Sequence, residues 1–138
     1  MSREEEIDEW VEQGFALFAK RENEAAEQKF ERALRYSAAH ERALLGISLL
    51  YVSTGRGPMA LKMLQKEQKQ HPDKIGPYRA ISTVVRISGH LEIGERYFIS
   101  LLDSAPDTMH SYIYLGLAEI YAAIGNHEKL KPIVTVLI

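Results

Sequence analysis

Residues 41–74 read ERALLGISLLYVSTGRGPMALKMLQKEQKQHPDK, and this stretch decides the fold. Its first part places apolar residues three to four positions apart, which is typical of a helix with one buried face. The sequence GRGP at residues 55–58 interrupts this pattern, a second helical segment follows, and HPD at residues 71–73 ends it. Glycine favours a turn, and proline ends a helix because it has no N–H to donate. The stretch therefore predicts two antiparallel helices joined by a short turn.

The same organisation recurs along the chain every 34 residues, with two extra residues before the last copy. Three sets of positions carry it: Gly14, Ser48, Ser82 and Ala118; Ala26, Ala60, Gly94 and Leu130; and Phe30, Leu64, Phe98 and Val134. The turn positions are Arg21, Gly55, Gly89 and Gly125, while Pro72 and Pro106 end the second and third copies. Small residues let two helix backbones approach closely, and the large residue four positions on fills the crevice beside them.

These signals predict eight short helices. Ser2 with Glu5 forms a capping box that begins the first helix, and Asn23 is expected to cap the second, which ends near Ser37. Residues 133–138 are rich in β-branched side chains and are the one segment that would also suit a strand. One helix pair cannot bury its apolar side alone, so we expect neighbouring pairs to stack.

The pattern resembles the tetratricopeptide repeat. The residues that carry the resemblance are Trp10, Gly14, Ala26, Phe30, Ala33 and Leu34 in the first unit, then Tyr51, Gly55, Ala60, Leu64 and Pro72 in the second. It covers a single domain, residues 1–138, as four units at 7–40, 41–74, 75–108 and 111–138. Gly94 and Leu130 depart from the usual alanine or small residue. The resemblance implies an all-α, right-handed superhelical solenoid of about four helix pairs, in which the first helix of each pair lines a concave surface.

Composition excludes several classes of function. The 138 residues carry 17 basic and 19 acidic groups, and this net charge of −2 argues against a general binder of nucleic acid or anionic membrane. The absence of cysteine excludes disulfides, thiolate catalysis and cysteine-based metal sites. The longest uncharged run, residues 43–55, is too short to cross a bilayer, and the acidic start is unlike a secretory signal. A cytoplasmic location is therefore expected.

The resemblance also locates a candidate groove. If Trp10 and Gly14 mark the packing side of the first helix, the concave side is the stripe displaced by one residue. That stripe holds Val11, Phe15 and Phe18, then Leu45, Leu49 and Val52, then Arg79, Thr83 and Arg86, and finally Leu115, Glu119 and Ala122. We expect apolar side chains of a partner segment against the first two units, and a carboxylate of the partner at Arg79 and Arg86. Alternatively, the N-terminal segment or a second copy covers this stripe.

The expected function is non-enzymatic binding of a protein or peptide partner, as in a chaperone or assembly factor. Family members that hold acidic C-terminal peptides of heat-shock chaperones use a Lys/Asn and Lys/Arg clamp, but Val11, Phe15, Gly76 and Ala80 stand at those positions. The apolar groove looks more like that of small bacterial repeat chaperones that hold hydrophobic segments of type III secretion substrates.

Other candidate sites have simpler explanations. The five histidines, at positions 40, 71, 90, 110 and 127, lie in or beside turns without the spacing of a helical zinc motif, so no catalytic, cofactor or metal site is predicted. Residues 55–58 lack the Lys-Ser/Thr of a phosphate-binding loop. Lys62, Lys66 and Lys69 share one helix face, which suits either solvated surface or docking of an acidic partner.

The C-terminal unit leaves two hypotheses open. Leu130, Val134 and Leu137 continue the packing pattern into the last turns of the chain, where a polar capping helix is usual. The chain is then either an excised fragment of a longer repeat protein or a module that associates with itself. A homodimer would form through the apolar groove or through this end.

Overall fold

The computed structural model describes residues 1–137. Over this range the chain is all-helical, with no strand, and the prediction of eight helices is confirmed. The α-helices are α1 (Arg3–Ala19), α2 (Asn23–Tyr36), α3 (Glu41–Ser53), α4 (Gly57–Gln70), α5 (Ile75–Ser88), α6 (Leu91–Ser104), α7 (His110–Ile124) and α8 (His127–Leu137), and the short 3-10 helix η1 (Asp107–Met109) precedes α7. The β-branched tail is helical through Leu137, while Ile138 lies outside the described residues.

The first two helix starts differ from one another in how they are capped. Ser2 caps α1 as predicted, because its Oγ accepts a hydrogen bond from the Glu5 amide at 3.2 Å. The prediction for Asn23 is wrong: Asn23 is already the first residue of α2, and Glu22 precedes it without a side-chain capping bond. Helix α2 thus begins without the satisfied amide that an asparagine cap supplies.

Four residues with positive φ make the turns inside the helix pairs. They are Arg21, Gly55, Gly89 and Gly125, with φ of 62°, 79°, 77° and 73°, at separations of 34, 34 and 36 positions. Glycine adopts this left-handed conformation without the steric cost that a Cβ imposes. These are the turn positions predicted from the sequence, including the arginine in the first pair.

Replacing Arg21 by glycine should stabilise the protein. A left-handed conformation costs an ordinary L-residue about 1–2 kcal/mol, and the extra chain entropy of glycine takes back about 0.5–1 kcal/mol. We expect Arg21→Gly to raise the free energy of unfolding by up to about 1.5 kcal/mol in urea denaturation. Lys20→Gly is the control, since Lys20 has φ of −87° and should lose stability on substitution. Equal losses in both variants would contradict this account of the turn.

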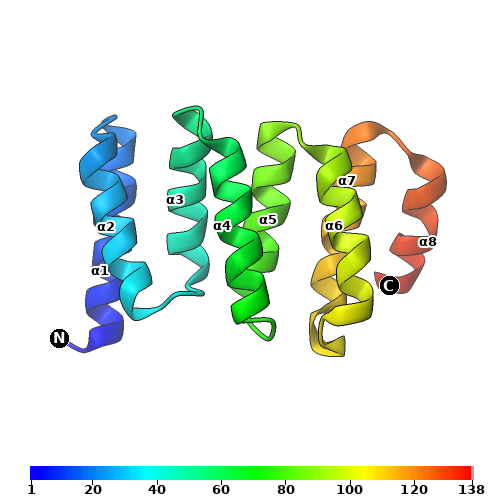
Figure 1. The fold of residues 1–138 in the computed structure, drawn as a ribbon, viewed down its shortest axis with the longest axis horizontal. Coiled ribbons are helices and arrows are strands. Elements are labelled where there is room, and N and C mark those ends of the chain that lie inside the picture. Colours follow the sequence, from blue (N-terminus) through cyan, green and yellow to red (C-terminus); the bar gives the residue numbers. More distant parts are fainter. Residues whose placement is uncertain (138) are drawn as a thin grey trace.

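The helices pack in neighbouring pairs and form a row from the N-terminus to the C-terminus (Figure 1). Each helix contacts the next one along the chain, and the odd-numbered helices also contact one another in the order α1, α3, α5, α7. The even-numbered helices cover one side of this odd-numbered layer. The opposite face of the layer therefore runs the length of the row and brings together residues from all four units.

Large side chains pack against glycines where the backbones approach most closely. A Cβ placed on Gly14 or on Gly46 would lie 2.7 Å or 2.4 Å from the Phe30 ring, so this ring fills the space between α1 and α3. The Phe98 ring lies against Gly116 of α7 in the same way. Phe30, Leu64 and Phe98, which are 34 positions apart, are all fully buried. The pairing of small and large residues expected from the sequence thus forms the core.

Candidate functional site

The predicted groove residues lie on the odd-numbered helices, but they differ in exposure. Arg79, Arg86, Leu115 and Ala122 are exposed, and the others except Val11 are half-buried: Phe15 and Phe18 of α1; Leu45, Leu49 and Val52 of α3; Thr83 of α5; and Glu119 of α7. Val11 is only 1% exposed and belongs to the core, so its assignment to the groove is wrong. Its short side chain does not reach past its neighbours, whereas leucine and arginine at the equivalent positions 45 and 79 extend further.

A hollow of about 240 Å³ opens between α3, α5 and α7. It is lined by Glu41, Leu45, Tyr78, Arg79, Ala80, Ser82, Thr83, Arg86, Tyr112, Leu115, Gly116 and Glu119. Six of the predicted stripe residues therefore come together here: Leu45, Arg79, Thr83, Arg86, Leu115 and Glu119. Phe15, Phe18, Leu49 and Val52 lie outside this hollow. The hollow thus lies toward the C-terminal half of the odd-layer face.

Six lining residues lie outside the predicted stripe: the buried Tyr78, Ala80, Ser82 and Gly116, and the more accessible Glu41 and Tyr112. Glu41 lies one turn before Leu45, and Tyr112 lies one turn before Leu115, on the same helix faces. Extending the predicted stripe by one turn toward the start of each helix would have found both. Tyr112 also lies beneath a cation, since the Arg79 guanidinium is 5.5 Å from its ring centre.

The two arginines of the hollow are paired within the chain. Arg79 contacts Glu41 of α3 at 3.0 Å, and Arg86 contacts Glu119 of α7 at 3.0 Å. The Ser82 hydroxyl also donates a hydrogen bond to Glu119 at 2.8 Å. The hydrogen bond with Glu41 raises the pKa of the Arg79 guanidinium above its ordinary value. A partner carboxylate at Arg79 or Arg86 must therefore compete with Glu41 or Glu119.

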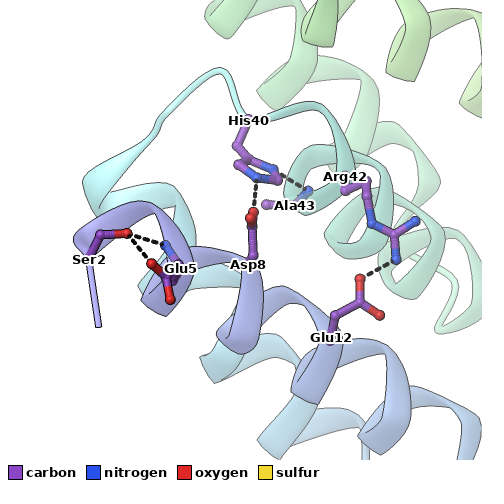
Figure 2. A network of polar contacts seen from close by, with 7 residues as sticks. All are labelled: Ser2, Glu5, Asp8, Glu12, His40, Arg42 and Ala43. Carbon is purple, nitrogen blue, oxygen red and sulfur yellow. Dashed lines mark hydrogen bonds and ion pairs between the residues drawn. The ribbon is translucent and has the colours of Figure 1, made fainter.

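Similar polar contacts join α1 to α3 (Figure 2). The His40 ring lies between Asp8, 3.4 Å from its Nε2, and the Ala43 amide, which donates to its Nδ1 at 3.2 Å. Because Nδ1 accepts, a neutral His40 ring carries its proton on Nε2, facing the aspartate. His40 thus caps α3 and also holds it to α1.

Arg42 covers part of the predicted apolar trough. Its guanidinium donates to Glu12 at 2.6 Å and lies 4.8 Å from the ring centre of Phe15. The opposite edge of Phe15 meets Phe30, with ring centres 5.1 Å apart. Phe15 therefore has a cation on one side and the core on the other, and it offers a partner less apolar surface than the sequence pattern indicates.

Outside the hollow, the described chain has a basic face on α4. Lys62, Lys66 and Lys69 are exposed on α4, in the even-numbered layer and away from the hollow. Residues 1–137 contain no group of three His, Cys, Asp or Glu side chains placed to hold a metal ion. Over the same residues, every helix is too short or too polar to cross a bilayer.

Comparison with known proteins does not identify a family for this chain. None of the protein-family models matches the chain, and no curated protein is significantly similar to it.

Proposed function

We propose that the chain is a scaffold of the tetratricopeptide type, a right-handed superhelical solenoid that binds a segment of a partner protein and performs no chemistry of its own. Three observations support this proposal. The helices pack in neighbouring pairs, the positive-φ turns recur at separations of 34, 34 and 36 positions, and Phe30 packs against glycines of α1 and α3. Stacked helix pairs of this kind create extended surfaces for peptide binding.

The hollow between α3, α5 and α7 is the observation that carries the proposed function. Leu45, Leu115 and Tyr112 give it apolar walls, and Leu115 is 42% exposed. One partner side chain that buries itself here contributes about 1.5–3 kcal/mol, whereas an exposed ion pair contributes about 0–1 kcal/mol. We therefore assign the affinity to an apolar anchor residue, while Arg79 and Arg86 orient the partner segment.

Such a groove suits a chaperone or assembly factor that holds an apolar segment of its partner until that segment reaches its final binding site. An enzyme needs polar groups that converge on a reacting atom. In the hollow, the charged groups pair with one another instead, as Arg79 does with Glu41 and Arg86 with Glu119. This arrangement favours binding over catalysis.

Selection from a library of random peptides tests the groove. We expect the wild-type chain to enrich peptides with a shared apolar anchor, and Leu115→Asp to weaken their binding at least about tenfold, since a loss of 1.4 kcal/mol corresponds to that factor. Ile99→Asp on α6 is the matched control, because Ile99 is 47% exposed and lies in the other layer. Equal retention of the peptides by both variants would contradict the proposal.

A further inference from the structure

The end of the row formed by α7 and α8 presents side chains that correspond to buried ones elsewhere. We call Tyr114, Ala118, Leu130, Val134 and Leu137 the tail surface. Val134 is 40% exposed, whereas the equivalent Phe30, Leu64 and Phe98 in the three earlier even-numbered helices are 0% exposed. In those helices, the next odd-numbered helix covers this position.

Helix α7 shows the same difference. Leu44 and Tyr78 are buried, as are Ser48 and Ser82 one turn further along α3 and α5. The equivalent residues of α7, at the longer separation of 36 positions, are Tyr114 and Ala118, and both are half-buried. The tail surface thus has the composition of an internal packing surface, with small and large apolar side chains side by side.

The opposite end of the row has a different chemistry. Helix α1 exposes Glu4, Glu5 and Glu9, in addition to Asp8 and Glu12, which contact His40 and Arg42. Residues 111–138, in contrast, balance Lys129 and Lys131 against Glu119 and Glu128. Stacking the tail surface of one copy on α1 of another would bury carboxylates against apolar side chains, which is costly without compensating partners. Two tail surfaces meet without such a cost and without net charge repulsion.

We propose that the tail surface binds the tail surface of a second copy of this chain around a two-fold axis. The Val134 and Leu137 side chains of each copy then pack beside the small Ala118 of the other, as large and small residues do inside the row. A contact between identical surfaces closes on itself, so it yields a dimer and no longer polymer. The hollow uses a different part of α7, at Tyr112 and Leu115, and stays open in this dimer.

Sedimentation equilibrium of the full chain and of two double variants tests this interface. We expect a wild-type dimer, and a monomer for Val134→Asp with Leu137→Asp. The matched control is Ile93→Asp with Ile99→Asp, two isoleucines of α6 that are exposed to a similar extent. This control should remain dimeric, and circular dichroism should show both variants folded, since all four substituted side chains are exposed.

Three results would overturn the proposal. The first is a wild-type monomer at concentrations up to about 1 mM, where weak association is still measurable. In that case a segment of another protein would be the ligand of the tail surface. The second is a dimer that the α8 substitutions leave intact, and the third is a series of larger oligomers. Because peptide binding depends on Leu115 and dimerisation on Val134 and Leu137, either activity can fail while the other is retained.

Disulfide trapping tests the orientation of the two copies. The chain has no cysteine, so a single introduced thiol reports on one position alone. Val134 is an exposed member of the tail surface, and Val134→Cys should form a covalent dimer under mild oxidation. Ser2→Cys, at the opposite end of the row, should remain monomeric after the same oxidation and on the same non-reducing gel. Cross-linking through Ser2→Cys and not through Val134→Cys would contradict a tail-to-tail dimer.

Discussion

Phe30→Ala is expected to lower the free energy of unfolding by about 3–5 kcal/mol, the usual range for removing a buried aromatic ring. Phe30 is fully buried, and its ring lies against Gly14 of α1 and Gly46 of α3. Neither glycine has a side chain that can move into the space left by the ring. The cavity should therefore persist between the first two helix pairs, which places the loss toward the upper end of this range.

Tyr36→Ala is the control for Phe30→Ala, because it removes an aromatic ring from the same helix at a position that is 55% exposed. We expect it to lower the free energy of unfolding by about 1 kcal/mol, since it removes a contact with the Trp10 ring but leaves no internal cavity. Gly46→Ala should cost about 1–3 kcal/mol in the wild type by overpacking the Phe30 ring, and much less in the Phe30→Ala background. Urea denaturation measures the three single variants and the double variant. If the losses of stability from Phe30→Ala and Gly46→Ala simply added in the double variant, the contact between Phe30 and Gly46 would be contradicted.

Gly76→Ala is expected to destabilise the protein by about 1–3 kcal/mol or more through steric conflict with backbone. Gly76 lies in the first turn of α5, and a Cβ added there would lie 2.2 Å from the carbonyl oxygen of Ala39 and 3.2 Å from the backbone of Glu41. Backbone atoms cannot rotate away as a flexible side chain can. To admit the methyl group, α5 must shift relative to the segment that joins α2 to α3.

Gly57→Ala provides a matched comparison at the start of α4. A Cβ added at Gly57 would meet nothing closer than the Ser88 Cβ at 3.9 Å, which is an ordinary contact. This variant should be neutral or more stable by about 0.4–1 kcal/mol, because alanine restricts the unfolded chain. Thermal unfolding of both variants gives the comparison, and equal stability would contradict the close approach at Gly76. A shift of α5 would also displace Arg79, so Gly76→Ala should weaken peptide binding as well.

The helices and their turns could be predicted because their signals are local. Glycine at positions 55, 89 and 125 is typical of a left-handed turn. Arg21 was identified as a fourth turn position by the spacing alone, because arginine does not favour this conformation. The capping interaction of Ser2 with Glu5 was also visible, since its two residues are only three positions apart. The missed cap at Asn23 was a shift of one residue, which is the usual uncertainty of a helix start.

The groove could be predicted only in part, because its shape depends on how the helices cross. Of the stripe of residues one position from the packing side, Leu45, Arg79, Thr83, Arg86, Leu115 and Glu119 line the hollow. Val11 obeyed the same spacing yet is buried, because exposure also depends on side-chain length and on neighbouring helices.

The ion pairs across the odd-layer face could not be predicted from spacing. Glu12 pairs with Arg42, Glu41 with Arg79, and Arg86 with Glu119, at sequence separations that differ from pair to pair. Which side chains meet is set by the stagger and tilt of adjacent helices, and neither property follows from a helical pattern. The same pairs change the functional interpretation, since they leave apolar contact as the main source of affinity.

Amide chemical-shift mapping tests the proposed groove most directly. A peptide recovered by the wild-type chain, and lost by Leu115→Asp, is titrated into isotopically labelled protein. Binding in the hollow predicts the largest shifts around Leu45, Thr83 and Leu115, with little change in α4 and α8. Shifts concentrated at the Lys62–Lys66–Lys69 face of α4, or at Val134 and Leu137 of α8, would contradict the account.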